Sequence, residues 1–139
     1  MVKYLISKSP VSVYSRMGSL KHPKEDHAII VLDFANTTAC IEVNLFTPHK
    51  VRTLVATGSE GIAYLDYIEQ SVTVHNSQGT HLADIQKAEP LKLELEDFLQ
   101  SVIMDRSPSV DGKEGMEVLK IALEASSSNS YTSQLILHR

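Results

Sequence analysis

The chain has 139 residues, of which 42% are hydrophobic and 22% charged, a composition typical of one folded domain. Its formal net charge of −4 disfavours a nucleic-acid partner, because phosphate binding needs a basic face. Apolar runs such as Ala28–Leu32 are far too short to span a bilayer. We therefore expect a single domain over residues 1–139, with no nucleic-acid and no membrane partner.

The start of the chain and its one cysteine bear on the compartment. Met1–Ile6 has neither a long apolar core nor a small-residue cleavage site, so we expect no secretory signal. Cys40 is the only cysteine and cannot form an internal disulfide. Its position between Ala39 and Ile41 favours a buried, inert thiol. Together these features predict a cytoplasmic protein.

The first two-thirds of the sequence predict β-strands, because short runs rich in β-branched and aromatic residues alternate with turn-forming residues. A hairpin is expected around Ala35–Thr37, and turns at Gly58–Gly61 and Asn76–Gly79 predict a meander. The expected strands are Val11–Arg16, Ala28–Phe34, Thr38–Phe46, Val51–Thr57, Ile62–Tyr67 and Ser71–His75, with Thr80–Gln86 as a candidate for a last short strand.

Two helices are predicted after these strands. Pro90 suits a first helical turn, where its missing N–H needs no partner, and Arg106–Pro108 ends that helix. Asp111 and Glu114 predict a capping box for the next helix. Gln134–His138 is expected to be a final strand or a frayed tail. The apolar face expected for the first helix is Leu91, Leu95, Phe98, Leu99 and Val102, and the inner face expected for the second is Gly115, Leu119, Ala122, Leu123 and Ser126.

A run of strands followed by a run of helices predicts an α+β fold, with a mainly antiparallel open-faced sheet and helices packed on one face. Within Ala28–Leu32 both sides of the strand are apolar, whereas a strand with one face in water alternates. We therefore expect the second sheet face to meet another subunit or a further domain.

Several segments, in their order, resemble the C-terminal domain of the glucose-fructose oxidoreductase / inositol dehydrogenase (Gfo/Idh/MocA) family of NAD(P)-dependent oxidoreductases. The resemblance covers about residues 1–126, and its form is most similar to relatives that process nucleotide-linked sugars. It rests on Glu25–Ala28 leading into Ile29–Phe34, on TPHKVR at Thr47–Arg52, on VATGSEG at Val55–Gly61, on LDYIEQ at Leu65–Gln70, on Glu89–Leu91 through Phe98, and on Asp111–Gly115 with Val118–Ala125.

The chain also departs from the family pattern. It has six glycines but no G-x-G-x-x-G turn, which in the family holds the dinucleotide. The family's Lys-Pro dipeptide and its Asp…His acid/base motif are absent, and Met1–Ile6 resembles the tail of the helix that follows this motif. The resemblance therefore implies a substrate-binding and oligomerisation half that is inactive alone. It implies no cofactor in this chain, and NAD or NADP for the full-length enzyme.

The resemblance also implies a substrate site at a sheet edge. Thr47, His49, Lys50 and Arg52 are expected to contact a carboxylate or phosphate of a sugar or nucleotide-sugar, since arginine binds anions bidentately and lysine binds them as a point charge. Asn44, on the preceding strand, is expected to bond a sugar hydroxyl. The alternative for Thr47, His49, Lys50 and Arg52 is an ordinary solvated strand end after a proline. The alternative for Asn44 is a residue that fills a half-polar sheet face.

Other chemistries find less support in the residues. His75 and His81 flank a turn, and His49 is a third candidate ligand, but no zinc motif or cysteine pair supports a metal site. Asp66, Glu69 and Asp84 show no spacing that indicates a hydrolase. Two rival interpretations stay open, a stand-alone binding or assembly module derived from this fold and an unrelated α+β domain. If the chain is the substrate-binding half of an oxidoreductase, the expected partners are further copies of this chain, through the open sheet face. A sugar or nucleotide-sugar substrate is then expected to bind together with the missing Rossmann half.

Overall fold

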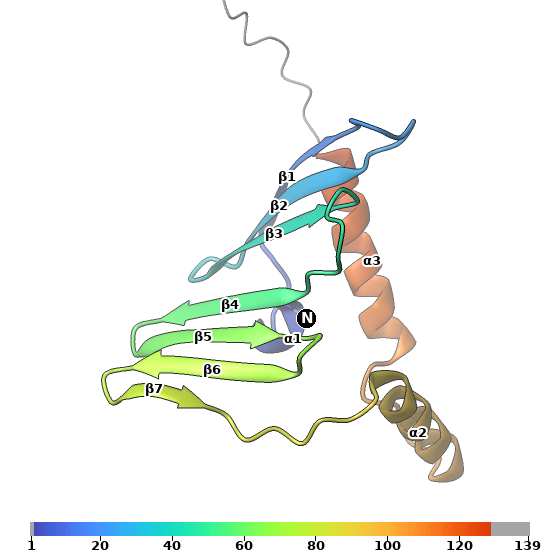
Figure 1. Ribbon diagram of the computed structural model, residues 1–139. Coiled ribbons are helices and arrows are strands. Elements are labelled where there is room, and N and C mark those ends of the chain that lie inside the picture. Colours follow the sequence, from blue (N-terminus) through green and yellow to red (C-terminus); the bar gives the residue numbers. More distant parts are fainter. Residues whose placement is uncertain (1, 129–139) are drawn as a thin grey trace, which may run out of the picture. The chain divides into compact units, whose positions relative to one another are not determined.

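The computed structural model describes residues 2–128, and the chain divides into two compact units (Figure 1). The first unit combines Met1–Phe46 with Val110–Arg139, and the second unit is Thr47–Ser109. The single domain expected over residues 1–139 stays a prediction. The expected strand or tail at Gln134–His138 lies outside the described residues.

The first unit contains a three-stranded antiparallel sheet. Its strands are β1 (Ser12–Gly18), β2 (His27–Asp33) and β3 (Thr38–Asn44), in the order β1-β2-β3. Val13 lies opposite Leu32 in the register of β1 and β2. The β2–β3 hairpin turns at residues 34–37, as the sequence predicts.

One face of this sheet carries the core of the first unit. Helix α3 (Gly112–Ser127) packs against β1, and α1 (Val2–Ile6) adds Val2 and Ile6 to the same cluster. α3 contributes Ala125 and Ile121 to the core. The inner face predicted for this helix is therefore wrong, because Leu119 and Leu123 are exposed. Among the described residues, the buried members of this core are Val13, Leu32, Phe34 and Ala125.

The start of α3 is held by a cap and an ion-pair cluster. The Asp111 side chain accepts a hydrogen bond from the Glu114 N–H at 2.8 Å, which confirms half of the predicted capping box. The Glu114 carboxylate does not complete the box, because it accepts from Lys3 Nζ at 2.7 Å. Lys3 also pairs with Glu117 at 2.6 Å, and the hydrogen bonds to Glu114 and Glu117 raise the pKa of Lys3. This cluster ties α1 to α3.

The other face of the three-stranded sheet is uncovered in the described structure. Cys40 is exposed, so the prediction of a buried thiol is wrong. The reason is register, because Cys40 lies opposite Val31, which alternates with the buried Leu32 and so belongs to the uncovered face. Tyr14 and Ile29 share this face, with exposed fractions of 62% and 48%.

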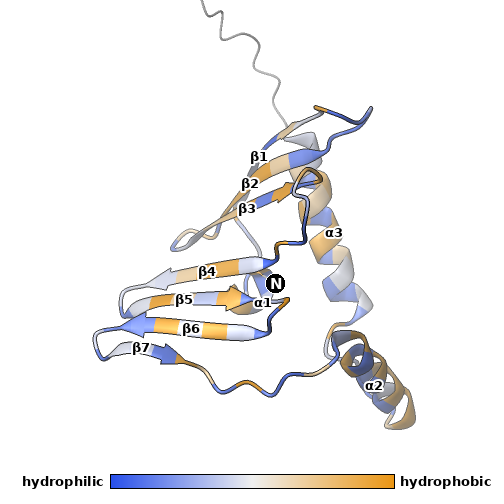
Figure 2. Cartoon of the chain, in the orientation of Figure 1, coloured by the Kyte–Doolittle hydropathy of each residue, from blue (hydrophilic) through white to orange (hydrophobic). Residues whose placement is uncertain are grey.

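The second unit contains a four-stranded antiparallel meander with strands β4 (Thr53–Gly58), β5 (Gly61–Asp66), β6 (Ser71–Asn76) and β7 (Gly79–Leu82), in sequence order. β7 ends four residues before the candidate strand Thr80–Gln86 does. The α+β class with antiparallel sheets is confirmed, and the strands divide between two sheets. Leu54, Leu65 and Val72 lie opposite one another in the register of β4–β6 and therefore share one face. Hydrophobic residues recur along β4, β5 and β6 in Figure 2.

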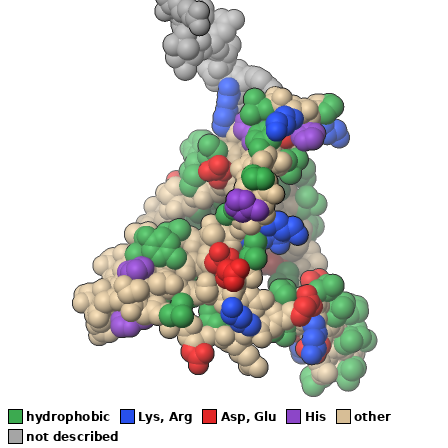
Figure 3. All heavy atoms as spheres, in the orientation of Figure 1, with side chains coloured by type: hydrophobic (Ala, Val, Ile, Leu, Met, Phe, Trp, Pro, Cys, Tyr) green, Lys and Arg blue, Asp and Glu red, His purple; other side chains and the backbone are tan. Residues whose placement is uncertain are grey.

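Helix α2 (Pro90–Ile103) ends the second unit and exposes its apolar side. Glu89 caps it by accepting from the N–H groups of Leu91 and Lys92, and Pro90 occupies its first turn as predicted. Hydrophobic side chains gather over α2 in Figure 3. Phe98 is 58% exposed and Val102 is 65% exposed. Within residues 2–128, no helix has the length and apolar character needed to cross a membrane.

Candidate functional site

The predicted sugar-binding residue Asn44 closes β3 in the first unit. It is exposed, and its side-chain oxygen accepts a hydrogen bond from the Phe46 N–H at 3.0 Å. In the sheet register Asn44 lies directly opposite His27, the first residue of β2. This end of the sheet therefore presents two side chains with hydrogen-bonding atoms on neighbouring strands.

The other four predicted residues lie in the second unit. Thr47, His49, Lys50 and Arg52 belong to an irregular, exposed segment that leads into β4. The Arg52 carbonyl accepts from the Tyr67 N–H at 2.9 Å, which extends the β4–β5 ladder by one bond. The structure thus gathers two cationic side chains and a histidine on one short segment. Its combination with Asn44 into a single site stays a prediction.

A buried carboxylate beside His27 was missed by the sequence reasoning. The Asp26 residue is 3% exposed, and its carboxylate accepts from the N–H groups of Leu20, Lys21 and His22 at 2.7–3.1 Å. It also bonds His27 Nδ1 at 3.0 Å. Burial raises the pKa of Asp26, but these hydrogen bonds outweigh burial and hold the pKa well below its ordinary value.

The only sequence signal for this carboxylate is the Glu25–Ala28 segment, which the resemblance singled out without giving it a role. A loop of successive N–H groups around one carboxylate depends on the backbone path of residues 19–22. Composition and spacing do not reveal that path. The structure therefore adds Asp26 and His27 to the residues that surround Asn44.

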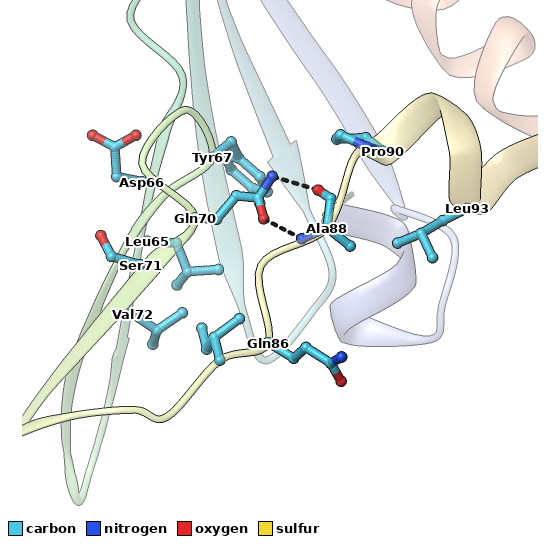
Figure 4. Close-up of a pocket in the computed structure, with 11 residues that line it drawn as sticks. Leu65, Asp66, Tyr67, Gln70, Ser71, Val72, Gln86, Ala88, Pro90 and Leu93 are labelled. Atoms are coloured by element: carbon cyan, nitrogen blue, oxygen red, sulfur yellow. Dashed lines mark hydrogen bonds between the residues drawn. The ribbon is translucent and has the colours of Figure 1, made fainter.

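A pocket lies at one end of the four-stranded sheet, next to the connection from β7 to α2 (Figure 4). Its volume is about 280 Å³. Gln70 and Ala88 both line it and are joined by two hydrogen bonds. The Gln70 side chain donates to the Ala88 carbonyl at 2.7 Å and accepts from the Ala88 N–H at 2.9 Å. The lining is mostly apolar and includes Leu65, Val72, Ile85, Pro90 and Leu93.

Tyr67 lines this pocket, and its hydroxyl is buried without a hydrogen-bond partner among the described residues. Burial raises the pKa of the Tyr67 phenol. The hydroxyl is also shielded from solvent, so a molecule in the pocket does not reach it in this conformation. We therefore assign the pocket a packing role at the start of α2.

The alternative chemistries gain no support from the described residues. Among residues 2–128, no group of three or more histidine, cysteine or carboxylate side chains could hold a metal ion. His75 Nδ1 instead lies 2.7 Å from the Thr80 hydroxyl, and its ring meets Tyr64 edge-on. The Asp66 carboxylate accepts from the N–H groups of Ile68 and Glu69, which is the role of a turn former.

Comparisons with known proteins connect this fold to one class of enzyme structures. No protein-family model matches the sequence, and no curated protein matches it. Among solved structures, UDP-N-acetylglucosamine 3-dehydrogenase GnnA from Acidithiobacillus ferrooxidans matches with a TM-score of 0.83 and 23% identity. The match covers 91% of this chain and 42% of the dehydrogenase.

Two further structures are provisionally described as oxidoreductases. One, from Thermotoga maritima, has a TM-score of 0.79 and 17% identity over 95% of this chain and 42% of its own. The other, from Desulfitobacterium hafniense and described as NADPH-dependent, has a TM-score of 0.81 and 14% identity over 92% of this chain and 42% of its own. At these identities the likeness shows the fold alone. The chain spans about two-fifths of the length of these structures.

Proposed function

We propose that this chain is the substrate-binding and oligomerisation part of an NAD(P)-dependent oxidoreductase of the Gfo/Idh/MocA family, which acts on a sugar or nucleotide-sugar. The observation that carries the proposal is the extent of the structural match. Nearly the whole chain, 91% of it, superimposes on 42% of a UDP-N-acetylglucosamine dehydrogenase. The ordered motifs from Glu25–Ala28 to Val118–Ala125 support the same assignment.

Two exposed apolar stripes support a role as part of a larger assembly. On α2, Leu91, Leu95 and Phe98 recur at helical spacing, and each is more than half exposed. α3 has a second apolar side, with Met116, Leu119 and Leu123 exposed while Ile121 and Ala125 face the core. Apolar stripes of this kind are normally covered by another domain or subunit. A stand-alone module would leave both stripes in water.

The residues of this chain indicate which functions of the enzyme it performs and which belong elsewhere. The chain has no glycine-rich dinucleotide turn, so the nicotinamide cofactor and the hydride transfer belong to another stretch of polypeptide. This chain would hold the substrate, with Lys50 and Arg52 on the diphosphate or carboxylate and Asn44 on a sugar hydroxyl. A reducing cytoplasm fits this role, because Cys40 is an exposed thiol.

The test joins the chain to a dinucleotide-binding half from a matching enzyme and follows the absorbance of reduced cofactor with nucleotide sugars as substrates. We expect turnover by the joined protein, and no calorimetric binding of NAD(H) by the chain alone. Arg52→Ala should raise KM about tenfold with little change in kcat, because it removes a charge-assisted contact made in both ground and transition states.

Lys87→Ala is the matched control, because Lys87 is an exposed cation in the connection to α2. It should leave both kinetic constants unchanged. Saturable NAD(H) binding by the chain alone, or an unaltered KM in Arg52→Ala, would contradict the assignment of these roles.

We also infer that the chain associates with copies of itself through an open sheet face. The uncovered face of the three-stranded sheet carries the apolar side chains of Tyr14, Ile29 and Val31. Because the opposite face of β2 packs into the core, this strand is apolar on both of its faces. Multi-angle light scattering should give a dimer or larger at tens of micromolar, since standard interfaces bury about 1,600 Å². Ile29→Lys should shift the protein towards monomer. A monomeric wild-type chain at that concentration counts against this surface.

A further inference from the structure

An oriented histidine lies opposite the predicted sugar-binding residue. His27 begins β2, and its sheet partner on β3 is Asn44. The Asp26 side chain is fully buried, and its Oδ1 lies 3.0 Å from His27 Nδ1. The His27 side chain is 36% exposed, so a buried carboxylate fixes a ring that solvent and ligands can reach.

The carboxylate decides which ring nitrogen carries the proton. Asp26 accepts from three backbone N–H groups and stays ionised at neutral pH, since its pKa is lowered. An ionised carboxylate only accepts hydrogen bonds, so Nδ1 of His27 must donate to it. Nε2 of the neutral ring is then an acceptor. No hydrogen bond to Nε2 is found among the described residues.

Neighbouring residues also restrict the orientation of the His27 ring. A Cβ added to Gly18, which pairs with His27 in the sheet, would lie 2.6 Å from Cε1 and 2.7 Å from Nε2 of the imidazole. Only glycine at position 18 leaves room for the ring in this orientation. The Phe46 ring is a second neighbour of the imidazole, with 5.9 Å between the ring centroids and 46° between the ring planes. Lys21 Nζ lies 5.5 Å from the centroid of Phe46.

These groups suit one class of ligand. An unprotonated Nε2 needs a partner that donates, and the Lys21 ammonium needs one that accepts. Neighbouring hydroxyls of a sugar do both, and the Phe46 ring offers an apolar surface for the C–H groups between them. A phosphate or carboxylate is a poorer match for His27, because it has no proton to give to Nε2.

We propose that His27 binds a hydroxyl group of the sugar substrate through Nε2, in a subsite shared with Asn44, Phe46 and Lys21. Asp26 and Gly18 are positioning residues, because they act by holding the imidazole. The inference rests on the proposed function and deepens it, since it names the part of the substrate that this end of the three-stranded sheet recognises.

The first measurement concerns the ring itself and does not depend on enzymatic activity. Long-range ¹H–¹⁵N spectra of the ¹⁵N-labelled chain at neutral pH should show His27 with its proton on Nδ1. A proton on Nε2 in the neutral ring would overturn the proposal. N-acetylglucosamine and UDP-N-acetylglucosamine are then titrated to millimolar concentrations, with inorganic pyrophosphate as the comparison, because it carries phosphates and no sugar hydroxyls. The His27 Nε2 resonance should move with the two sugars and stay in place with pyrophosphate.

Three variants separate recognition from folding. His27→Phe keeps a ring of similar shape without nitrogens, and Gly18→Ala displaces the ring without removing it. Each should weaken sugar binding about tenfold or more, with circular dichroism unchanged. His81→Gln on β7 is the control and should bind as the wild type does.

Sugar binding that is unaltered in both His27→Phe and Gly18→Ala would overturn the subsite, and so would a His27 signal that neither sugar moves. In the joined oxidoreductase, KM of the nucleotide sugar should rise in both variants. Lack of turnover by the joined wild type, with His27 still responding to sugar, would contradict the oxidoreductase assignment and leave the sugar subsite standing.

Discussion

Replacing Phe34 by alanine is expected to lower the free energy of unfolding of the first unit by about 3 kcal/mol. Phe34 is 6% exposed and belongs to a small core, whose buried members among residues 2–128 are Val13, Leu32, Phe34 and Ala125. Removing its ring takes away a large share of the apolar area that joins the sheet to α3. Urea denaturation followed by circular dichroism measures the change.

Phe98→Ala on α2 is the matched control, because the same atoms are removed from a side chain that is 58% exposed. Its effect on the free energy of unfolding should stay within about 0.5 kcal/mol. The contrast tests the assigned core directly. Equal losses in the two variants would mean that α2 is buried by a contact between copies of the chain, and that the four-residue core is not the main source of stability.

The strands were largely predictable from the sequence. β2 and β6 follow runs rich in β-branched residues. Gly61 and Gly79 end the turns that separate β4 from β5 and β6 from β7. Gly61 and Gly79 adopt φ values of 157° and 120°, so the turn prediction there has a clear physical basis. Local chemistry of this kind is fully visible in a sequence.

The packing of α3 was not predictable in the same way. The helix is apolar on two sides, one with Leu119 and Leu123 and the other with Ile121 and Ala125. Periodicity marks both sides equally, and it cannot say which one meets the sheet. The choice depends on the register of β1 and β2, which places Val13 and Leu32 on a common face. The pairing of β1 with β2 therefore determines which side of α3 is buried, and the periodicity of α3 alone does not.

The candidate site shows the same limit. Asn44 and Thr47–Arg52 were found from motif order, whereas Asp26 and His27 became candidates only with the register that sets His27 opposite Asn44. The N–H groups around Asp26 come from a loop whose path no motif specifies. A structural carboxylate of this kind can nevertheless be tested by its effect on stability and on pH dependence.

Replacing Asp26 by asparagine is expected to lower the Tm by about 10 °C at neutral pH. Asparagine has nearly the same shape, but its amide N–H₂ would face backbone N–H groups of Leu20 and Lys21 that need an acceptor. It also loses the charge that orients His27. Thermal unfolding by circular dichroism gives the Tm, and Asp84→Asn, at an exposed position, should leave it unchanged.

The pH dependence of this difference has a definite sign. The hydrogen bonds hold the folded pKa of Asp26 well below its ordinary value of 3.8, so its contribution to stability is complete above that value. As the pH falls below about 4, the unfolded chain takes up the proton first and the contribution is lost. The difference in Tm between wild type and Asp26→Asn should therefore be constant from pH ~5 to ~7 and shrink below pH ~4. A difference that grows on acidification would mean that Asp26 is protonated in the folded chain, and the carboxylate would then not hold the His27 ring in the orientation that the sugar subsite requires.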